Sequence, residues 1–143
     1  MNELSKIKNA WNKVYVTHGK DVPWSNKDNV DSSLPVIIDF LKKNHISTSS
    51  LLDYGAGSGH FAVALKEKLS IPRVVCADIT DGGADREFLK QKGIEFVQVF
   101  QPKDVKEKFD IILCWSVLNH LDKNLREKFF AQFADMLMGG GAY

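Results

Sequence analysis

A glycine-rich turn between a predicted strand and a predicted helix constrains the fold of this chain more than any other segment. Residues 51–60 read LLDYGAGSGH, so an apolar run passes into a turn with glycine at every second position from Gly55 to Gly59. Glycine permits a tight turn and lets a ligand come close to the backbone. The helix that follows presents unpaired N–H groups at its N-terminus. The segment therefore predicts a ligand-binding strand–turn–helix unit.

The same alternation of strand and helix continues along the chain. Apolar runs predict further strands over residues 73–78, 94–99 and 109–115. Apolar residues at helical spacing predict helices over residues 60–69, 85–92 and 122–138. Strands that alternate with helices indicate an α/β fold with a mainly parallel sheet.

The first 49 residues carry helix signals instead. Apolar residues at helical spacing predict an amphipathic helix, namely Leu4, Ile7, Trp11, Val14 and Tyr15. A turn-rich stretch over residues 18–33 follows, and Ser32, Ser33 and Pro35 predict the start of a second helix. We therefore divide the chain into an N-terminal helical segment, residues 1–49, and an α/β core, residues 50–143.

Composition excludes several classes of protein. The formal net charge is +1 and 44% of residues are hydrophobic, which is typical of a soluble globular domain and unlike a dedicated nucleic-acid binder. No apolar stretch is long enough to span a membrane, and the N-terminus does not read as a signal peptide. Cys76 and Cys114 each lie in an apolar run, which favours two reduced thiols and a cytoplasmic protein over the alternative of a disulfide.

An acidic residue that closes the next predicted strand narrows the ligand class. Asp78 lies 19 residues after Gly59, where acids of dinucleotide-binding folds bind ribose hydroxyls. The glycine spacing is G-x-G-x-G, not the G-x-G-x-x-G of nicotinamide and flavin sites, and Asp53 precedes the first glycine by two residues. A carboxylate there opposes a pyrophosphate and suits an amino group. These features favour S-adenosylmethionine, which has an amino-acid tail, a ribose and no phosphate.

At these residues the sequence resembles the class I S-adenosylmethionine-dependent methyltransferases of the small-molecule type. Four segments carry the resemblance in order, and together they lie within residues 50–143: the turn after Asp53, the acid Asp78, the run 109–121 and the run 136–141. The N-terminal segments Trp11–Tyr15 and Pro23-Trp24 are also similar to the helix-plus-loop lid of many such enzymes.

The resemblance implies a cofactor-binding role for a set of residues. The turn residues Gly55, Ala56, Gly57 and Gly59 would pack against the methionine part, and Asp53 would organise its amino group. The remaining members of the set are Asp78 for the ribose hydroxyls, Ile79 for the adenine face, and Trp115 and Ser116 near the sulfonium. Family members often carry an adenine-binding acid after the third strand, where this chain has Phe100-Gln101, so Gln101 or a backbone carbonyl would substitute.

His120 is the candidate catalytic base. It follows the predicted fourth strand, and the alternative is a residue that packs or caps at the start of the last helix. A base is needed only where the acceptor must lose a proton, because the methyl donor is already activated. The four histidines and two cysteines show no metal-ligand spacing, so no metal site is expected.

The resemblance also implies a three-layer, Rossmann-like sandwich whose seven strands are ordered 3-2-1-4-5-7-6. This sequence predicts four of them, in the order 3-2-1-4, and reaches Tyr143 at the threshold of the fifth. We therefore expect a C-terminally truncated domain in which the strand after residue 109 is an exposed apolar edge. Such an edge favours self-association.

The function implied is methyl transfer from S-adenosylmethionine to a small-molecule acceptor, with nucleic acid an improbable partner. Two alternatives remain open. One is an incomplete or non-catalytic fragment that binds the cofactor poorly, in keeping with the shortness of the chain and the missing adenine-binding acid. The other is a nicotinamide-dependent reductase, which the glycine spacing and Asp53 oppose.

Overall fold

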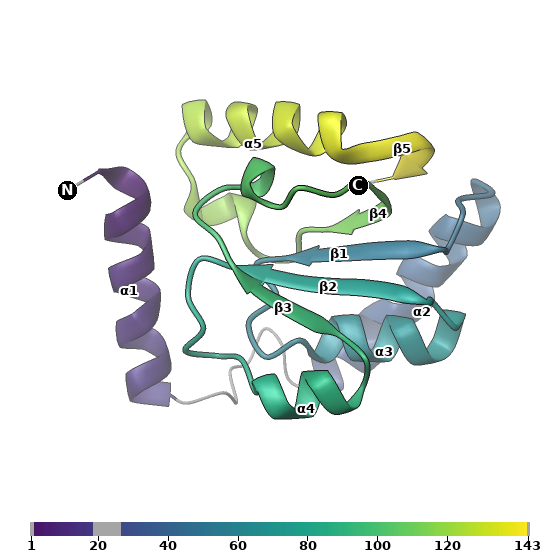
Figure 1. Cartoon of the computed structure of the whole chain (residues 1–143), viewed down its shortest axis with the longest axis horizontal. Helices are drawn as coiled ribbons and strands as arrows, with labels where there is room; N and C mark the ends of the chain where they lie inside the picture. The colour runs from purple at the N-terminus through teal and green to yellow at the C-terminus, as the bar shows by residue number, and fades with distance from the viewer. Residues whose placement is uncertain (1, 19–26, 143) are drawn as a thin grey trace.

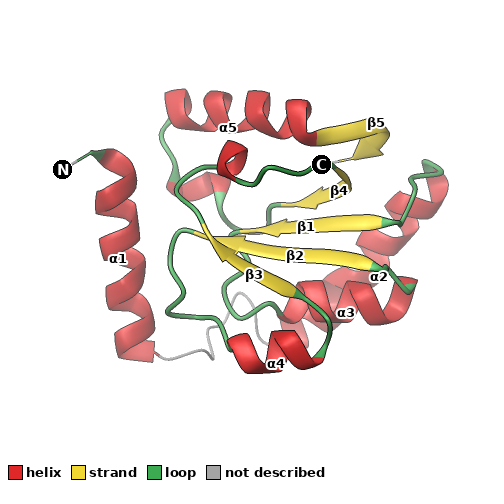
Figure 2. Cartoon of the chain, viewed as in Figure 1, coloured by secondary structure: helices red, strands yellow, loops and turns green. Residues whose placement is uncertain are grey.

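The computed structural model describes residues 2–18 and 27–142 and shows one parallel sheet with helices on both faces (Figures 1 and 2). The strands are β1 (Ser50–Tyr54), β2 (Arg73–Asp78), β3 (Glu95–Gln98), β4 (Phe109–Leu113) and β5 (Leu137–Ala142). The α-helices are α1 (Glu3–His18), α2 (Lys27–Lys43), α3 (His60–Leu69), α4 (Arg86–Gln91) and α5 (Lys123–Met136). Two short 3-10 helices are η2 (Pro102–Asp104) and η3 (Leu118–His120). The predicted α/β class is confirmed.

The sheet has the strand order β3-β2-β1-β4-β5, with β1 at its centre. Successive residues of β1 alternate between two cores, because side chains of a strand point to opposite faces. Leu51 packs with α2, α3 and α4 on one face, and Leu52 packs with Phe129 and Phe133 of α5 on the other. Every strand of the sheet pairs in parallel, so the carboxyl ends of the strands lie along one edge.

A fifth strand corrects the expected edge of the sheet. The sequence analysis placed the fourth strand at the edge, but β5 pairs with β4, from Leu137 opposite Phe109 to Ala142 opposite Ile111, with an irregularity between. The glycines of residues 139–141 have low strand propensity and read locally as a turn. Pairing with β4 outweighs that propensity. The self-association expected from an uncovered fourth strand therefore loses its structural basis.

The start of the second helix is also different from the prediction. Helix α2 begins at Lys27, so Pro35 lies inside it and residues 27–33 are helical, not turn. A proline inside a helix removes one hydrogen bond. The first turns of helix α2 are stabilised by tertiary packing, because Val30 and Leu34 are buried in the core formed with α3 and the sheet.

Other element ends follow from local capping. The Asp85 carboxylate accepts the N–H of Phe88 at the start of α4, and Asp122 accepts the N–H of Leu125 at the start of α5. Both contacts satisfy N–H groups that a helix leaves unpaired at its N-terminus. The predicted boundaries of these two helices therefore shift by one or two residues only.

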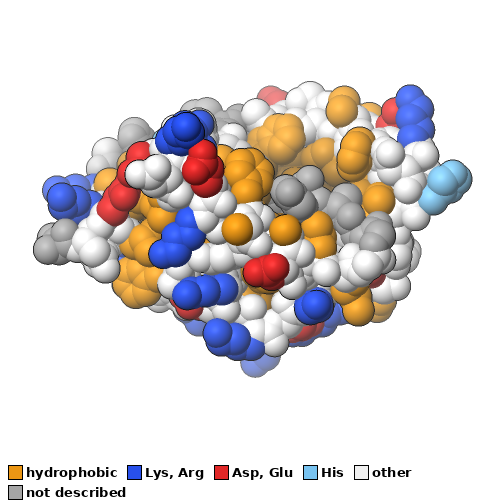
Figure 3. Space-filling view, turned by 90° about the horizontal axis from the view of Figure 1, so that it is seen from above, with side chains coloured by type: hydrophobic (Ala, Val, Ile, Leu, Met, Phe, Trp, Pro, Cys, Tyr) orange, Lys and Arg blue, Asp and Glu red, His pale blue; other side chains and the backbone are white. Residues whose placement is uncertain are grey.

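Helix α1 lies apart from the two helical layers, beyond the carboxyl ends of β1 and β2 (Figure 1). Leu4 and Ile7 of this helix pack against the core on the α5 side of the sheet. Seen from the α5 side, the surface carries apolar side chains between acidic and basic ones (Figure 3). No helix in residues 2–18 and 27–142 is long and apolar enough to cross a membrane.

Candidate cofactor and acceptor pocket

A pocket of about 620 Å³, including its open mouth, lies between α1 and the carboxyl ends of the strands. Its lining comes from α1, from the ends of β1 and β2, from the loops after β3 and β4, and from η3 and α5. The lining residues are Leu4, Ile7, Trp11, Tyr15, Tyr54, Gly55, Asp78, Ile79, Phe100, Trp115, Ser116, Val117, His120, Leu121 and Phe129.

The glycine turn is held against the end of β2. The N–H groups of Gly55 and Ala56 both donate to the carbonyl of Ala77, at 2.7 and 3.1 Å. Gly55 has a φ of +76°, which disfavours other residues, and a Cβ on it would lie 2.1 Å from Cγ2 of Val117. Glycine is therefore required here by the backbone and by the close approach of the loop after β4.

The third glycine has a packing reason of its own. Gly59 has a φ of +82°, and a Cβ there would lie 2.6 Å from a methyl carbon of Leu89 in α4. Gly59 does not line the pocket. Its role in the described structure is to let α3 and α4 approach each other.

Asp78 ends β2 at the floor of the pocket. One carboxylate oxygen accepts the N–H of Gly57 at 2.8 Å, and the other accepts the N–H of Thr80 at 3.2 Å. Burial raises the pKa of Asp78 from its ordinary value, while these N–H groups lower it. The N–H of Ile79 is a third backbone donor to this carboxylate. A carboxylate has about four acceptor sites, so capacity remains for a ligand hydroxyl.

Asp53 lies one layer deeper, in β1. Its side chain is 3% exposed and does not line the pocket. Burial, together with the negative charge of Asp78, raises its pKa to about 7, although a hydrogen bond from the Ala62 backbone acts to lower it. The two carboxylates thus form a buried acidic pair behind the glycine turn, which favours a positively charged group in front of them.

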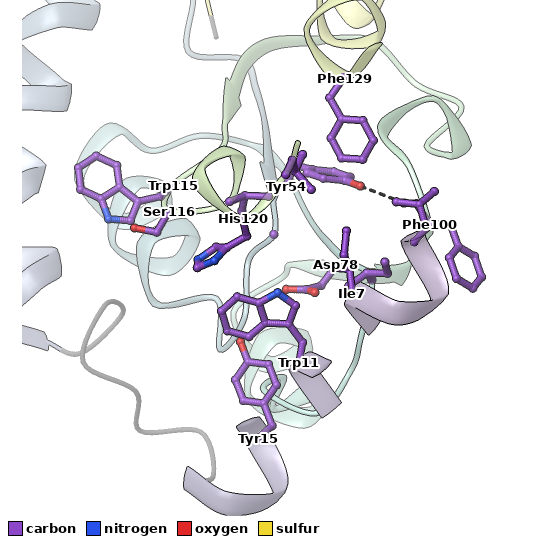
Figure 4. A pocket seen from close by; sticks show the side chains of 15 residues that line it. Ile7, Trp11, Tyr15, Tyr54, Asp78, Phe100, Trp115, Ser116, His120 and Phe129 are labelled. Carbon is purple, nitrogen blue, oxygen red and sulfur yellow. Dashed lines mark hydrogen bonds between the residues drawn. The ribbon is translucent and has the colours of Figure 1, made fainter. Parts of the chain in front are cut away.

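Helix α1 forms the roof of the pocket, and its contacts are the part of the site that sequence patterns did not predict residue by residue. Trp11 and Tyr15 lie over the floor, and Figure 4 shows the indole of Trp11 directed toward Asp78. The Tyr15 hydroxyl lies close to Gly57, since a Cβ on that glycine would be 2.9 Å from it. Thr80 Oγ1 donates a hydrogen bond to Asn12 Oδ1 and ties α1 to the loop after β2.

The loop and the 3-10 helix after β4 carry three further predicted pocket residues. Trp115 packs on Phe61, with ring centroids 5.0 Å apart, and Ser116 adopts a φ of +55°. Left-handed backbone is uncommon outside glycine and marks a constrained position. His120 meets Trp11 edge-on, with centroids 5.0 Å apart and planes at 87°. The imidazole therefore both lines the pocket and packs against α1.

The expected substitute for the adenine-binding acid is engaged elsewhere. Gln101 does not line the pocket, and its side-chain oxygen accepts a hydrogen bond from Gln132 of α5. The acid nearest in sequence, Asp104, accepts the N–H groups of Phe100 and Gln101. Phe100 lines the pocket, so an apolar ring stands near the position where an acid was sought.

The predicted site residues therefore fall into two groups. Six of them line the pocket, namely Gly55, Asp78, Ile79, Trp115, Ser116 and His120. Asp53, Ala56, Gly57 and Gly59 lie behind it and form its frame. Trp24 lies outside the described residues. Among the described residues, no group of three or more histidines, cysteines or acidic residues has a geometry that would hold a metal ion.

Comparison with known proteins identifies the family. A family model described as a methyltransferase domain matches residues 52–143. The chain belongs to this methyltransferase family. The matched residues run from β1 through the glycine turn, Asp78 and the loop after β4, so the resemblance inferred from those segments is confirmed. No curated protein matches the chain significantly.

Solved structures share the fold at low sequence identity. An S-adenosylmethionine-dependent methyltransferase from Clostridium acetobutylicum is 19% identical, with a TM-score of 0.66, over 98% of this chain and 55% of its own. DesVI from Streptomyces venezuelae is 19% identical, with a TM-score of 0.64, over 93% of this chain and 53% of its own. Magnesium protoporphyrin IX methyltransferase from Synechocystis, with bound S-adenosylhomocysteine, is 13% identical, with a TM-score of 0.72, over 95% of this chain and 68% of its own. The chain thus spans about half the length of the first two, whose fold is Rossmann-like.

Proposed function

We propose that this methyltransferase-family chain binds S-adenosylmethionine in the pocket under α1 and directs its methyl group to a small-molecule acceptor. The observation that carries the proposal is the buried Asp78 carboxylate at the pocket floor, joined to the glycine turn through the N–H of Gly57. That contact fixes the distance between the acid and the turn. The two groups implied to bind the ribose and the methionine part therefore form one rigid surface.

The residues present fit this cofactor by their chemistry. Asp78 retains acceptor capacity for a ribose hydroxyl, and the acidic pair with Asp53 favours the cofactor's amino group. Ile79 and Val117 offer apolar surface for the adenine ring. When bound, the cofactor supplies an activated methyl group, and the protein's part is to orient the acceptor and exclude water.

His120 is the proposed general base, and α1 the proposed lid. The imidazole faces the pocket from η3, where it can accept a proton from an acceptor hydroxyl. Trp11 and Tyr15 of α1 cover the floor, so opening of α1 would admit ligands and its closure would exclude water. The division at residue 49 and a cytoplasmic location stay predictions from the sequence.

Calorimetry with S-adenosylhomocysteine tests the cofactor assignment independently of catalysis. We expect the wild type to bind and Asp78→Asn to bind about 10- to 100-fold more weakly, because hydrogen bonds to a charged group are lost. Asp81→Asn is the matched control, since Asp81 is exposed in the following loop and pairs only with Arg86, at 3.6 Å, among the contacts described. Circular dichroism establishes that each variant is folded. A folded wild type that does not bind would overturn the proposal.

A further inference from the structure

The lining of the pocket is rich in aromatic rings. Figure 4 shows His120 beside Trp11, near Asp78, and Trp115 with Ser116 farther from Asp78. Trp11 lies 6.1 Å from Tyr15 between ring centroids, so the wall formed by α1 continues the aromatic surface inward. Trp115 is 36% exposed, which places it at the rim. A lining with several aromatic rings favours a flat aromatic ligand, which can stack on them or meet them edge-on.

The charged side chains of the pocket lining disfavour a charged methyl acceptor. The described lining residues contain one carboxylate, Asp78, and neither lysine nor arginine. Among the described lining residues, an acceptor with a carboxylate or phosphate would find no cationic side chain to offset its lost hydration. A protonated amine would be repelled by the positively charged sulfonium of the cofactor, and under the proposed function the nearby acidic pair already faces the cofactor's own amino group. An amine in that form also has no lone pair for the methyl group.

The polar groups at the mouth favour a hydroxyl nucleophile. His120 and the hydroxyl of Ser116 are the polar side chains of the described lining that come from the loop and 3-10 helix after β4. An imidazole nitrogen accepts the proton of an aromatic hydroxyl readily, since that proton is acidic. The proton of an uncharged aromatic amine becomes acidic only after methylation, so a base at this place favours the oxygen nucleophile.

We propose, on the basis of the methyltransferase function above, that the acceptor is an uncharged, planar aromatic hydroxy compound bound between Trp11, Trp115 and His120. The hydroxyl proton passes to a His120 imidazole nitrogen, and an oxygen lone pair forms the bond to the methyl carbon. The carbon–sulfur bond breaks, and its electron pair remains on sulfur. The products are an aryl methyl ether and S-adenosylhomocysteine, and His120 returns the proton to water.

Calorimetry on the full chain, saturated with S-adenosylhomocysteine, tests this class of acceptor. The probes are 2-naphthol, 2-naphthoate and 2-methoxynaphthalene, which share one ring system and differ in charge and in the hydroxyl hydrogen. We expect 2-naphthol to bind at least about tenfold more tightly than 2-naphthoate, because the anion finds no cationic partner. Equal or tighter binding of 2-naphthoate, or no binding of 2-naphthol, would overturn the inference.

Variants locate the probe and separate stacking from hydrogen bonding. Trp11→Leu and Trp115→Leu should each weaken 2-naphthol about three- to tenfold, as for loss of one aromatic pair. Phe130→Leu is the control, because Phe130 is exposed on α5 and does not line the pocket. His120→Phe should weaken 2-naphthol but not 2-methoxynaphthalene, which has no hydroxyl proton to donate. Equal effects on both probes would refute the role of His120.

Saturation with S-adenosylhomocysteine is measured first in every variant. If the wild type does not bind S-adenosylhomocysteine, the proposed function is refuted, and the proposed acceptor class is refuted with it. If the wild type binds S-adenosylhomocysteine but does not prefer 2-naphthol, the acceptor class is refuted and the proposed function is not.

Discussion

Replacement of Asp53 by asparagine should remove a pH-dependent loss of stability. Burial, together with the Asp78 charge, raises the pKa of Asp53 from 3.8 to about 7. A carboxyl whose pKa is higher in the folded state contributes stability below its unfolded pKa, and that stability is lost as the pH rises through the folded pKa. The relevant window is therefore pH 4 to 7, and ionisation opposes folding above it.

The magnitude follows from the same pKa values. The difference between 3.8 and about 7, at about 1.36 kcal/mol per pKa unit, corresponds to about 4 kcal/mol of stability lost once the pH exceeds both values. Between pH 5 and pH 8 the loss is about 2.5 kcal/mol. Asparagine cannot ionise, and its side-chain oxygen can still accept the Ala62 hydrogen bond that lowers the pKa of Asp53. The variant should gain about 2.5 kcal/mol on the wild type between these two pH values.

Urea unfolding at pH 5 and pH 8, followed by circular dichroism, measures both free energies. A constant packing cost of the amide cancels when the two pH values are compared, so the change with pH is the decisive quantity. Asp110→Asn is a matched buried control. At pH 8 this substitution should lower the free energy of unfolding, whereas Asp53→Asn should raise it relative to pH 5. The Asp110 carboxylate accepts N–H groups of Ser49 and Ser50, at 3.1 and 3.2 Å, and an amide should destabilise by about 1–3 kcal/mol at pH 8. A free-energy difference between wild type and Asp53→Asn that is the same at both pH values would refute the reasoning.

Two further predictions concern the turn and the thiols. Gly55→Ala should cost about 1–3 kcal/mol in thermal unfolding, because its Cβ would lie 2.1 Å from Val117 and its φ is +76°. Adding Val117→Ala should restore part of that loss, and no recovery would show that backbone strain alone is responsible. Burial raises the pKa of the Cys114 thiol to about 12 and that of Cys76 well above its ordinary value, so iodoacetamide at pH 8 should label neither in the native protein and both in urea. Native labelling of Cys76, measured by mass spectrometry, would contradict its placement.

Local patterns sufficed for the central strands and for the glycine turn. The continuous apolar runs of β1, β2 and β4 are typical of strands that are buried on both faces. Such a run can be recognised from neighbouring residues alone. The position of Asp78 at the end of β2 likewise follows from the length of one strand–helix–strand unit. Parallel strands bring their carboxyl ends to one edge, so the approach of Asp78 to the glycine turn could be inferred before any coordinates.

Tertiary structure decided the features that depend on distant partners. The glycines of β5 have no local preference for a strand and adopt one because β4 supplies the partner. Helix α2 extends through Pro35 because Val30 and Leu34 are buried. The packing of Trp11 on His120 joins α1 to η3, which are far apart in the sequence. The raised pKa of Asp53 likewise requires burial beside Asp78. The sequence by itself determined the strand–helix alternation and the glycine turn. Only long-range packing determined the edge of the sheet, the roof over the pocket and the raised pKa of Asp53 behind it, since none of these depends on neighbouring residues alone.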